Sequence, residues 1–453
     1  MHSADDIAMP FQSEIPKQKW PVHVEVRLKS RATARFNTIQ THVMNWIASF
    51  DRINLSSSLI GWEDVPELAS SVEQIATSDS ACPSQSLLID EMLLQVHVYQ
   101  PFNGDVDEEF ANGVGGDEDD ETMAATVREL PNRSWEGLWD SLIYEDNIKM
   151  KLLDYIHATL LLSDAGVDFN LVSWNRVVLL HGPPGTGKTS LCRALAQKLS
   201  IRLSERYSHA RLFEINSHSL FSKWFSESGK LVQRLFSNEV ESLTAARASA
   251  MAGTEPSDGL RVVNALLTQL DKLKHRKNVL VMSTSNLVKA IDTAFVDRAD
   301  IVQYIDLPPR DAVYEILRTC LSEVMSRGIV IPENIPSLQQ ALIYERTAPA
   351  QSSVAAMPDG SDAHGKSKLV GLRLLALATE CRAQRMSGRA LRRLPVLTLA
   401  KHISAGSIVS SYSSKVNGST PAKDSSSNAD VDTWLSGMET VVAEQATQRG
   451  NLI

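Results

Sequence analysis

The stretch that decides the fold is Gly182-Pro183-Pro184-Gly185-Thr186-Gly187-Lys188-Thr189, which fits the phosphate-loop pattern GxxxxGK[ST]. Glycines in this pattern let backbone N–H groups turn inward around the phosphates of a nucleotide. We expect Lys188 to contribute a positive charge to the outer phosphates and the hydroxyl of Thr189 to bind Mg²⁺. These eight residues and the following Ser190 therefore form the predicted site for ATP and its Mg²⁺ ion.

The flanking sequence supports this interpretation. The apolar run 177–180 enters the loop as a buried strand, and residues 190–196 leave it with the small, apolar pattern of a packed helix. With its flanking residues this strand spans 176–181, and three more are predicted at 211–216, 278–284 and 301–306, with helices between them. This alternation predicts an α/β fold with a doubly wound parallel sheet, in which ligands bind at the carboxyl ends of the strands.

Composition is that of an ordinary globular protein, with 43% hydrophobic and 22% charged residues. No apolar run approaches the roughly 20 residues that span a bilayer, so no membrane partner is expected. The four cysteines, Cys82, Cys192, Cys320 and Cys381, are scattered. They indicate neither disulfides nor a cysteine metal site, and together with the absence of a secretory signal at residues 1–6 they favour a cytosolic or nuclear protein.

The formal net charge of −9 has a local source. Residues 105–121 contain no base and nine acids: Asp105, Asp107, Glu108, Glu109, Asp117, Glu118, Asp119, Asp120 and Glu121. This segment is predicted to be a solvated linker. Four parts follow from these patterns: a small α+β domain at 1–102, the acidic linker at 103–133, a large ATPase subdomain at 134–309, and a helical lid at 310–453 with disordered inserts near 347–368 and 404–430.

Five residues beyond the loop are candidates for function by their order along the chain. Trp224 and Phe225 stand between polar neighbours after the second predicted strand, where AAA+ ATPases place a pore loop that grips polypeptide. The alternative is packing under a local turn. Asn286 ends the strand 278–284 and could orient the attacking water, although an Asn at this place is otherwise a turn former.

Two arginines complete the candidate set. Arg298 precedes the last core strand and, in a ring, could reach the nucleotide of a neighbouring subunit; the alternative is an ion pair with Asp297 or Asp300 of its own chain. Arg389 opens a basic amphipathic helix and could sense the phosphates from the lid; the alternative is a solvated basic face.

The chain resembles the pachytene checkpoint family of AAA+ ATPases, which includes the thyroid-hormone-receptor interactor. The stretches that carry the resemblance lie at 137–142, 174–181, 214–230, 241–247, 253–258 and 295–300, with weaker likeness at 22–26 and 387–389. The resemblance implies a homohexameric ring that remodels HORMA-domain proteins by pulling polypeptide through its pore. It also implies a substrate-binding N-terminal domain, possible use of an adaptor, and action in meiotic chromosome-axis control and spindle-checkpoint silencing. We therefore expect the protein in the nucleus, on chromosomes and in the cytoplasm.

One departure from the family concerns the acids. Phosphate-loop ATPases carry Asp-Glu at the end of a second core strand, where the Asp holds Mg²⁺ and the Glu polarises water. By resemblance, Glu239 falls at the catalytic Glu and Asn238 at the Asp, but no apolar strand precedes them. The acid-bearing core strand is therefore expected to be deleted, which would leave buried backbone groups unpaired unless residues 231–236 took its place.

Two explanations of this departure are open. The chain is a shortened product of an ordinary ATPase, through splicing or an incomplete gene model, or it is a genuine variant that hydrolyses ATP poorly. The cost of removing a central strand favours the first. As written, the chain is expected to bind ATP and hydrolyse it weakly, and a nucleotide-gated ring subunit without turnover is the alternative function. Direct action on nucleic acid is disfavoured, because no basic stripe with interleaved aromatic residues is present.

Overall fold

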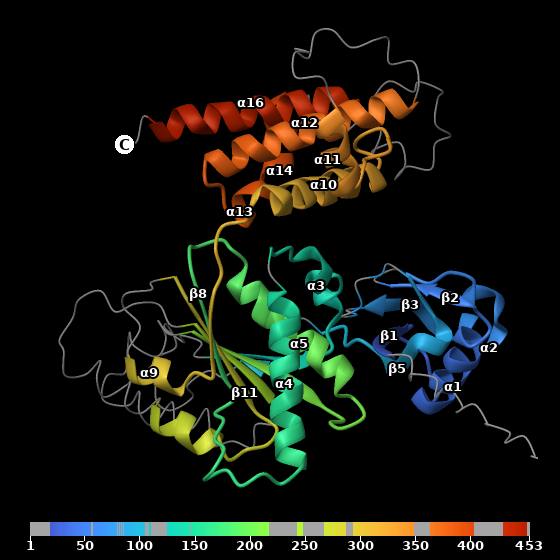
Figure 1. Ribbon diagram of the computed structural model, residues 1–453, viewed down its shortest axis with the longest axis vertical. Coiled ribbons are helices and arrows are strands. Elements are labelled where there is room, and N and C mark those ends of the chain that lie inside the picture. Colours follow the sequence, from blue (N-terminus) through green and yellow to red (C-terminus); the bar gives the residue numbers. More distant parts are fainter. Residues whose placement is uncertain are drawn as a thin grey trace, which may run out of the picture. The chain divides into compact units, whose positions relative to one another are not determined.

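Figure 1 shows a computed structural model of the chain, which divides into two compact units. The first unit comprises residues 1–105, 129–134 and 197–210, and the second comprises 106–128, 135–196 and 211–453. The structure describes residues 19–104, 108–109, 125–216, 242–247, 267–286, 293–347, 363–402 and 429–450, except 56, 57, 79, 81, 83, 85 and 146. None of the helices within these ranges is long and apolar enough to cross a membrane.

The first unit is built on a three-stranded sheet with the order β3-β1-β5. Strand β1 runs antiparallel to β3 and parallel to β5. Its alternate residues Val22, Val24 and Val26 are fully buried, as expected for a strand with one face on the core. The expected small α+β domain is thus observed, with elements β1 (Trp20–Leu28), α1 (Phe36–Ile47), β2 (Arg52–Asn54), α2 (Pro66–Ala69), β3 (Val72–Ser78), β4 (Ser86–Leu88) and β5 (Met92–Tyr99).

A seven-stranded sheet forms the centre of the second unit, with the order β12-β8-β11-β10-β9-β7-β6. Its five core strands are parallel, which confirms the predicted doubly wound sheet. Strand β11 is buried along its whole length, and β8 is buried except for its last residue, because helices cover both faces of such a sheet. The four predicted core strands are observed as β8 (Val177–His181), β9 (Ala210–Asn216), β11 (Leu280–Ser285) and β12 (Ile301–Tyr304).

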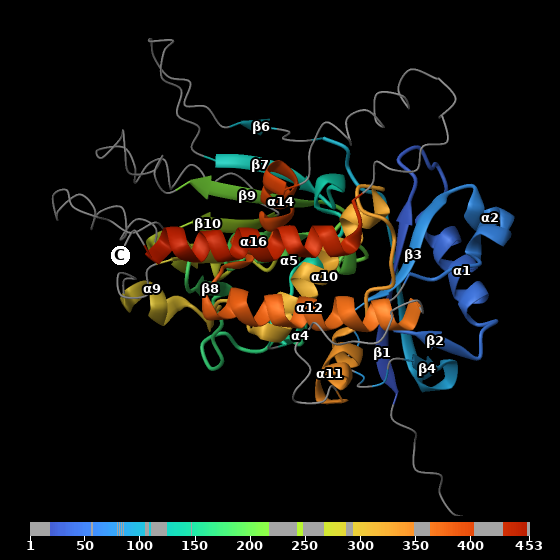
Figure 2. The same cartoon turned by 90° about the horizontal axis from the view of Figure 1, so that it is seen from above.

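The sheet contains a fifth core strand that the sequence analysis did not predict. Strand β10 (Ser242–Arg247) lies between β9 and β11 and pairs with both, so the position between them is filled. Figure 2 shows β10 beside β9. The segment considered as a substitute, 231–236, lies outside the described residues. The six residues of β10 include no Asp or Glu. The loss of an acid-bearing segment relative to the family therefore stays a prediction, although the strand position is filled.

The stretch expected to be a linker also contributes to this sheet. Strand β7 (Ala125–Leu130) continues the sheet beyond β9, and the two acids of β6 (Glu108–Glu109) pair antiparallel with it. The interpretation of 103–133 as a linker is therefore wrong for these two segments. Residues 110–124 lie outside the described part.

Helices surround the phosphate loop. The loop leads directly into α5 (Lys188–Arg202), and the buried side of α4 (Ile148–Asp164) carries Leu152, Leu153 and Ile156. Shorter helices are α3 (Leu138–Ser141), a helix at 267–273, and α9 (Thr293–Arg298).

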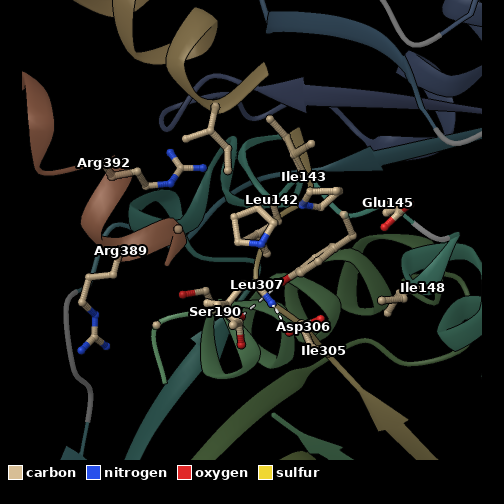
Figure 3. Close-up of a pocket in the computed structure, with 18 of the residues that line it drawn as sticks. Leu142, Ile143, Glu145, Ile148, Ser190, Ile305, Asp306, Leu307, Arg389 and Arg392 are labelled. Carbon is tan, nitrogen blue, oxygen red and sulfur yellow. Dashed lines mark hydrogen bonds between the residues drawn. The ribbon is translucent and has the colours of Figure 1, made fainter. Parts of the chain in front are cut away.

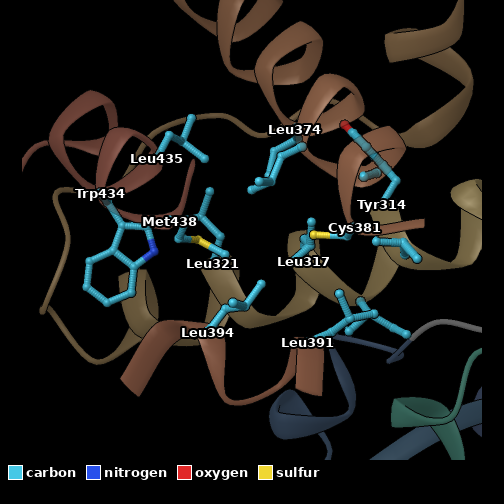
Figure 4. Close-up of a cluster of buried hydrophobic side chains, with 14 of the residues drawn as sticks. Tyr314, Leu317, Leu321, Leu374, Cys381, Leu391, Leu394, Trp434, Leu435 and Met438 are labelled. Atoms are coloured by element: carbon cyan, nitrogen blue, oxygen red, sulfur yellow. The ribbon is translucent and has the colours of Figure 1, made fainter. Parts of the chain in front are cut away.

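After Pro309 the described chain is helical, as predicted for a lid. Its core is a cluster of aliphatic side chains with the fully buried Trp434 and Tyr314 (Figure 4). Helix α12 begins inside the stretch 347–368 that was expected to be disordered, since its apolar residues Val370 and Leu374 pack on this cluster. The lid helices are α10 (Arg310–Ser326), α11 (Leu338–Thr347), α12 (Ala363–Ala383), α13 (Gly388–Leu391), α14 (Leu394–His402) and α16 (Val431–Gly450).

Candidate functional site

Strands β8, β11 and β12 end at the same edge of the sheet, so the residues that follow them lie together there. In the parallel register His181 lies opposite both Ser285 and Tyr304, so Gly182, Asn286 and Ile305 emerge at the same edge. Two backbone hydrogen bonds join them: Gly182 N donates to Ser285 O at 3.2 Å, and Ile305 N donates to His181 O at 2.8 Å. The predicted phosphate loop and Asn286 are thus brought together, and the side chain of Asn286 is exposed there.

The glycines of the loop are required by its geometry. Gly182, Gly185 and Gly187 have φ angles of +142°, +78° and +89°, which L side chains rarely adopt. A Cβ on Gly182 would lie 2.1 Å from the backbone oxygen of Ile305, a distance that backbone cannot relieve without moving β12. The loop therefore keeps a cradle free of side chains, and the 15-residue helix α5 begins at its end. This arrangement fits the phosphates of a nucleotide.

Lys188 is the buried cation of this cradle. Its ammonium group donates hydrogen bonds to the carbonyls of Gly182 at 2.8 Å and Pro183 at 2.6 Å. The lysine is therefore held by its own loop, within reach of any anion that the loop binds. Thr189 and Ser190 follow in the first turn of α5 and are half-buried. Burial, and then the nearby charge of Lys188, lowers the pKa of His181.

The lid reaches the loop through α13. The backbone N–H of Arg389 donates to Gly185 O at 3.1 Å, and the Ser387 hydroxyl accepts from Ala390 N at 3.3 Å as the cap of α13. The Arg392 guanidinium donates to the carbonyl of Ser141. A pocket of about 530 Å³ lies between the loop and these lid residues, and Arg389 and Arg392 lie on its lid side (Figure 3). The backbone of Arg389 thus lies at the loop while the residue is exposed, so both its predicted phosphate-sensing role and the alternative of a solvated basic face stay open.

Sequence reasoning missed one wall of this pocket. The wall is formed by the segment before α4, where Tyr144 donates a hydrogen bond to Gly187 O at 3.4 Å. Burial raises the pKa of Tyr144, which keeps the phenol protonated as a donor. The apolar residues Leu142, Ile143 and Ile148 complete the wall and suit a flat organic ring more than phosphate. The sequence marks these three residues only by their apolar character, which core packing also explains.

Arg298 has an intrachain partner that the sequence analysis did not consider. Its guanidinium forms a two-point ion pair with Asp271, at 2.9 and 3.0 Å. The Asp300 carboxylate accepts the hydroxyl of Tyr155 at 2.5 Å and the backbone N–H of Asn175. Asp300 thus fixes the residues that lead into β8. Burial, and then the hydrogen bond to Asp300, raises the pKa of Tyr155.

The acids expected beside the nucleotide are not among the described residues. Glu239 and Asn238 lie outside them, as do the predicted pore residues Trp224 and Phe225. By register, the residue of β10 nearest the loop edge is Arg247, which lies opposite Thr284 of β11. In the described part of the chain, no group of three or more His, Cys, Asp or Glu side chains could hold a metal ion. The described residues thus fit a nucleotide, and of the two expected Mg²⁺ ligands they contain only Thr189.

Three family models match the chain in succession. They are the TRIP13 N-terminal domain at residues 17–104, the AAA family of ATPases associated with various cellular activities at 178–307, and the TRIP13-like AAA+ ATPase lid C-terminal domain at 309–413. The order of these matches follows the order of the N-terminal domain, the phosphate-loop sheet and the helical lid.

Whole-chain relatives give the same result. The pachytene checkpoint protein 2 homolog of Danio rerio is 43% identical, over 87% of this chain and 92% of the relative. That of Homo sapiens is 41% identical, over 88% and 91%. Among solved structures, C. elegans PCH-2 superposes with a TM-score of 0.66 at 28% identity, covering 95% of this chain and all of that one.

Proposed function

Because the chain belongs to the pachytene checkpoint protein 2 family of AAA+ ATPases, we propose that it is an ATP-driven remodeller of HORMA-domain proteins. The observation that carries the proposal is the pocket between the phosphate loop and the lid, lined by Gly185, Gly187 and Arg389. A pocket that closes between two subdomains can convert the presence of a nucleotide into movement of the lid.

Within one subunit, different described residues bind different parts of the nucleotide. The loop amides and Lys188 bind the phosphates, and the apolar wall around Tyr144 receives the base. Thr189 would hold Mg²⁺, which would neutralise charge on the outer phosphates. Asn286, which follows β11, orients the attacking water. Arg389 interacts with the phosphates from the lid, so that the lid responds to bound nucleotide.

The remaining roles require a ring, which we propose to be a homohexamer. Arg298 then serves the nucleotide of the neighbouring subunit, and Trp224 and Phe225 grip the polypeptide in the pore. The family's name supports action in the meiotic checkpoint. We extend this proposal to spindle-checkpoint silencing, to the use of an adaptor for the substrate, and to a location in the nucleus, on chromosomes and in the cytoplasm.

A remodelling assay tests the proposal directly. A folded HORMA-domain protein is incubated with the chain and MgATP, and protease sensitivity of the HORMA termini is followed with time. We expect ATP-dependent exposure of the termini, which Trp224→Ala abolishes while ATP binding persists. Equal exposure without ATP, or with Trp224→Ala, would refute remodelling through the pore.

A second function, that of an ATP-binding ring subunit with poor hydrolysis, is favoured by β10, which includes no acid. Asn238 offers Mg²⁺ no negative charge, so hydrolysis by this chain should be weak. Steady-state ATPase assays compare the chain with a version in which an apolar strand is restored and Asn238→Asp is introduced. Robust and equal turnover by both proteins would exclude the poorly hydrolysing form, and a large gain in the restored version would support it.

A further inference from the structure

The guanidinium of Arg298 bonds acceptors of its own chain through all three of its nitrogens. Its Nε donates to Asp271 Oδ1 at 2.9 Å, its Nη2 donates to Asp271 Oδ2 at 3.0 Å, and its Nη1 donates to the carbonyl of Ala294 at 2.9 Å. Each of the three nitrogens therefore has an acceptor. An arginine that binds phosphate oxygens in a two-point geometry presents this same Nε and Nη2 edge, so the edge that holds Asp271 cannot hold a phosphoryl group at the same time.

The two partners come from separate elements that precede and follow β11 along the chain. Asp271 lies in the helix at 267–273, before β11, and Arg298 is the last residue of α9, before β12. The side chain of Arg298 is 28% exposed and that of Asp271 is 44% exposed, so the pair stands at the surface, where another subunit could reach it. The hydrogen bonds from Arg298 hold the pKa of Asp271 below its usual value, which keeps the carboxylate charged.

We propose that Asp271 is a positioning residue that holds Arg298 in a resting state, from which the arginine must be released to act on a neighbouring subunit's nucleotide. The proposal rests on the ring function proposed above. In the resting state the carboxylate neutralises the guanidinium charge and occupies two of its donor positions. Release exchanges the two carboxylate oxygens for phosphate oxygens, so that Arg298 contributes to catalysis only when a neighbour presents the transferring phosphate.

The strength of the pair sets the size of the expected effect. Ion pairs with this degree of exposure contribute little to stability. The need to break the pair between Asp271 and Arg298 is therefore expected to lower the rate of ATP hydrolysis by a factor of about two to five. A restraint of this size would delay hydrolysis without preventing it.

The test uses Asp271→Asn in the full chain, because asparagine keeps the shape of the side chain and removes its charge. Two readouts are measured: the single-turnover rate of ATP hydrolysis, and the affinity for ADP with aluminium fluoride relative to ADP alone. We expect both to rise about two- to fivefold. Neither should change when Asp271→Asn is added to Arg298→Ala, and Asp271→Glu should restore the original values.

Glu345→Gln is the matched control, since Glu345 pairs with Arg310 at 2.5 Å with side-chain exposures of 45% and 31%. It should change neither readout. A fall in both readouts with Asp271→Asn, or no change, would overturn the resting state while leaving the ring function intact. If Arg298→Ala itself leaves the affinity ratio unchanged, Arg298 does not act in trans, and both this inference and that part of the proposed function fail.

Discussion

Replacing Gly185 with alanine should uncouple the lid from the phosphate loop. A Cβ at this position would lie 2.7 Å from Ser387 Oγ, 3.0 Å from Ser387 Cβ and 3.3 Å from Arg389 Cβ. These contacts are too close, so the start of α13 must move away. The hydrogen bond from Arg389 N to Gly185 O, 3.1 Å long, would then be lost.

The Gly185→Ala substitution has two energetic effects, which are measured separately. The φ of +78° strains alanine by about 1–2 kcal/mol whether or not nucleotide is bound, so it lowers the free energy of unfolding. The crowding and the lost hydrogen bond arise only when the lid is docked, and cost about 2 kcal/mol. Since the lid forms one wall of the pocket, we expect the affinity for a fluorescent ATP analogue to fall about 30-fold.

Gly166→Ala is the control for strain alone. Gly166 has a φ of +65°, and a Cβ there would meet no atom within 4 Å. This variant should lose stability in a thermal melt but keep its affinity for nucleotide. Adding Ser387→Gly to Gly185→Ala removes the two closest of the three crowding atoms at little cost to the cap, and should recover most of the affinity. An unchanged affinity in Gly185→Ala, or no recovery in the double variant, would refute docking of the lid on the loop.

Three further outcomes test the site and its supports. Lys188→Ala removes a charged hydrogen-bond donor, so it should weaken ATP binding about 10- to 100-fold in a calorimetric titration. The melting temperature should stay unchanged. Asp300→Asn should lower the free energy of unfolding by about 1–3 kcal/mol, and Tyr155→Phe by less, since Asp300 also accepts the N–H of Asn175. Burial, then Arg202, lowers the pKa of His97 to about 4 from 6.5, so stability from its neutral form should be complete above pH 6.5 and decline by ~3 kcal/mol as pH falls towards 4. Denaturant titrations across this range should show a flatter profile for His97→Gln, and identical profiles would contradict the assignment.

Much of the core could be predicted because its signals are local. An apolar run such as 177–180 before a glycine-rich loop specifies strand, turn and helix from neighbouring residues alone, and those elements were observed. Asn286 lies directly after β11 and Arg389 lies inside α13, and their roles at the nucleotide stay predictions. The roles of Glu239, Asn238, Trp224 and Phe225 stay predictions, since these residues lie outside the described part of the chain.

The interpretations that failed depended on pairing between distant segments. Residues 242–247 have no strand pattern strong enough to predict β10, and β7 follows an acidic stretch that reads as solvated. Each becomes a strand because the edge of a neighbouring strand supplies hydrogen-bond partners that its own sequence does not encode. The contact of Tyr144 with Gly187 was missed for the same reason, since 43 residues separate the two.

The sequence by itself determined that this protein has a phosphate loop, a parallel sheet and a helical lid, because glycine conformations and apolar periodicity act over a few residues. Tertiary structure decided which strand fills the centre of the sheet, which acid holds Arg298, and which lid residues meet the loop. These are choices among several chemically equivalent partners. Asp271, Asp297 and Asp300 carry the same carboxylate, and only the packing of α9 against the helix at 267–273 brings the first of them within hydrogen-bond distance.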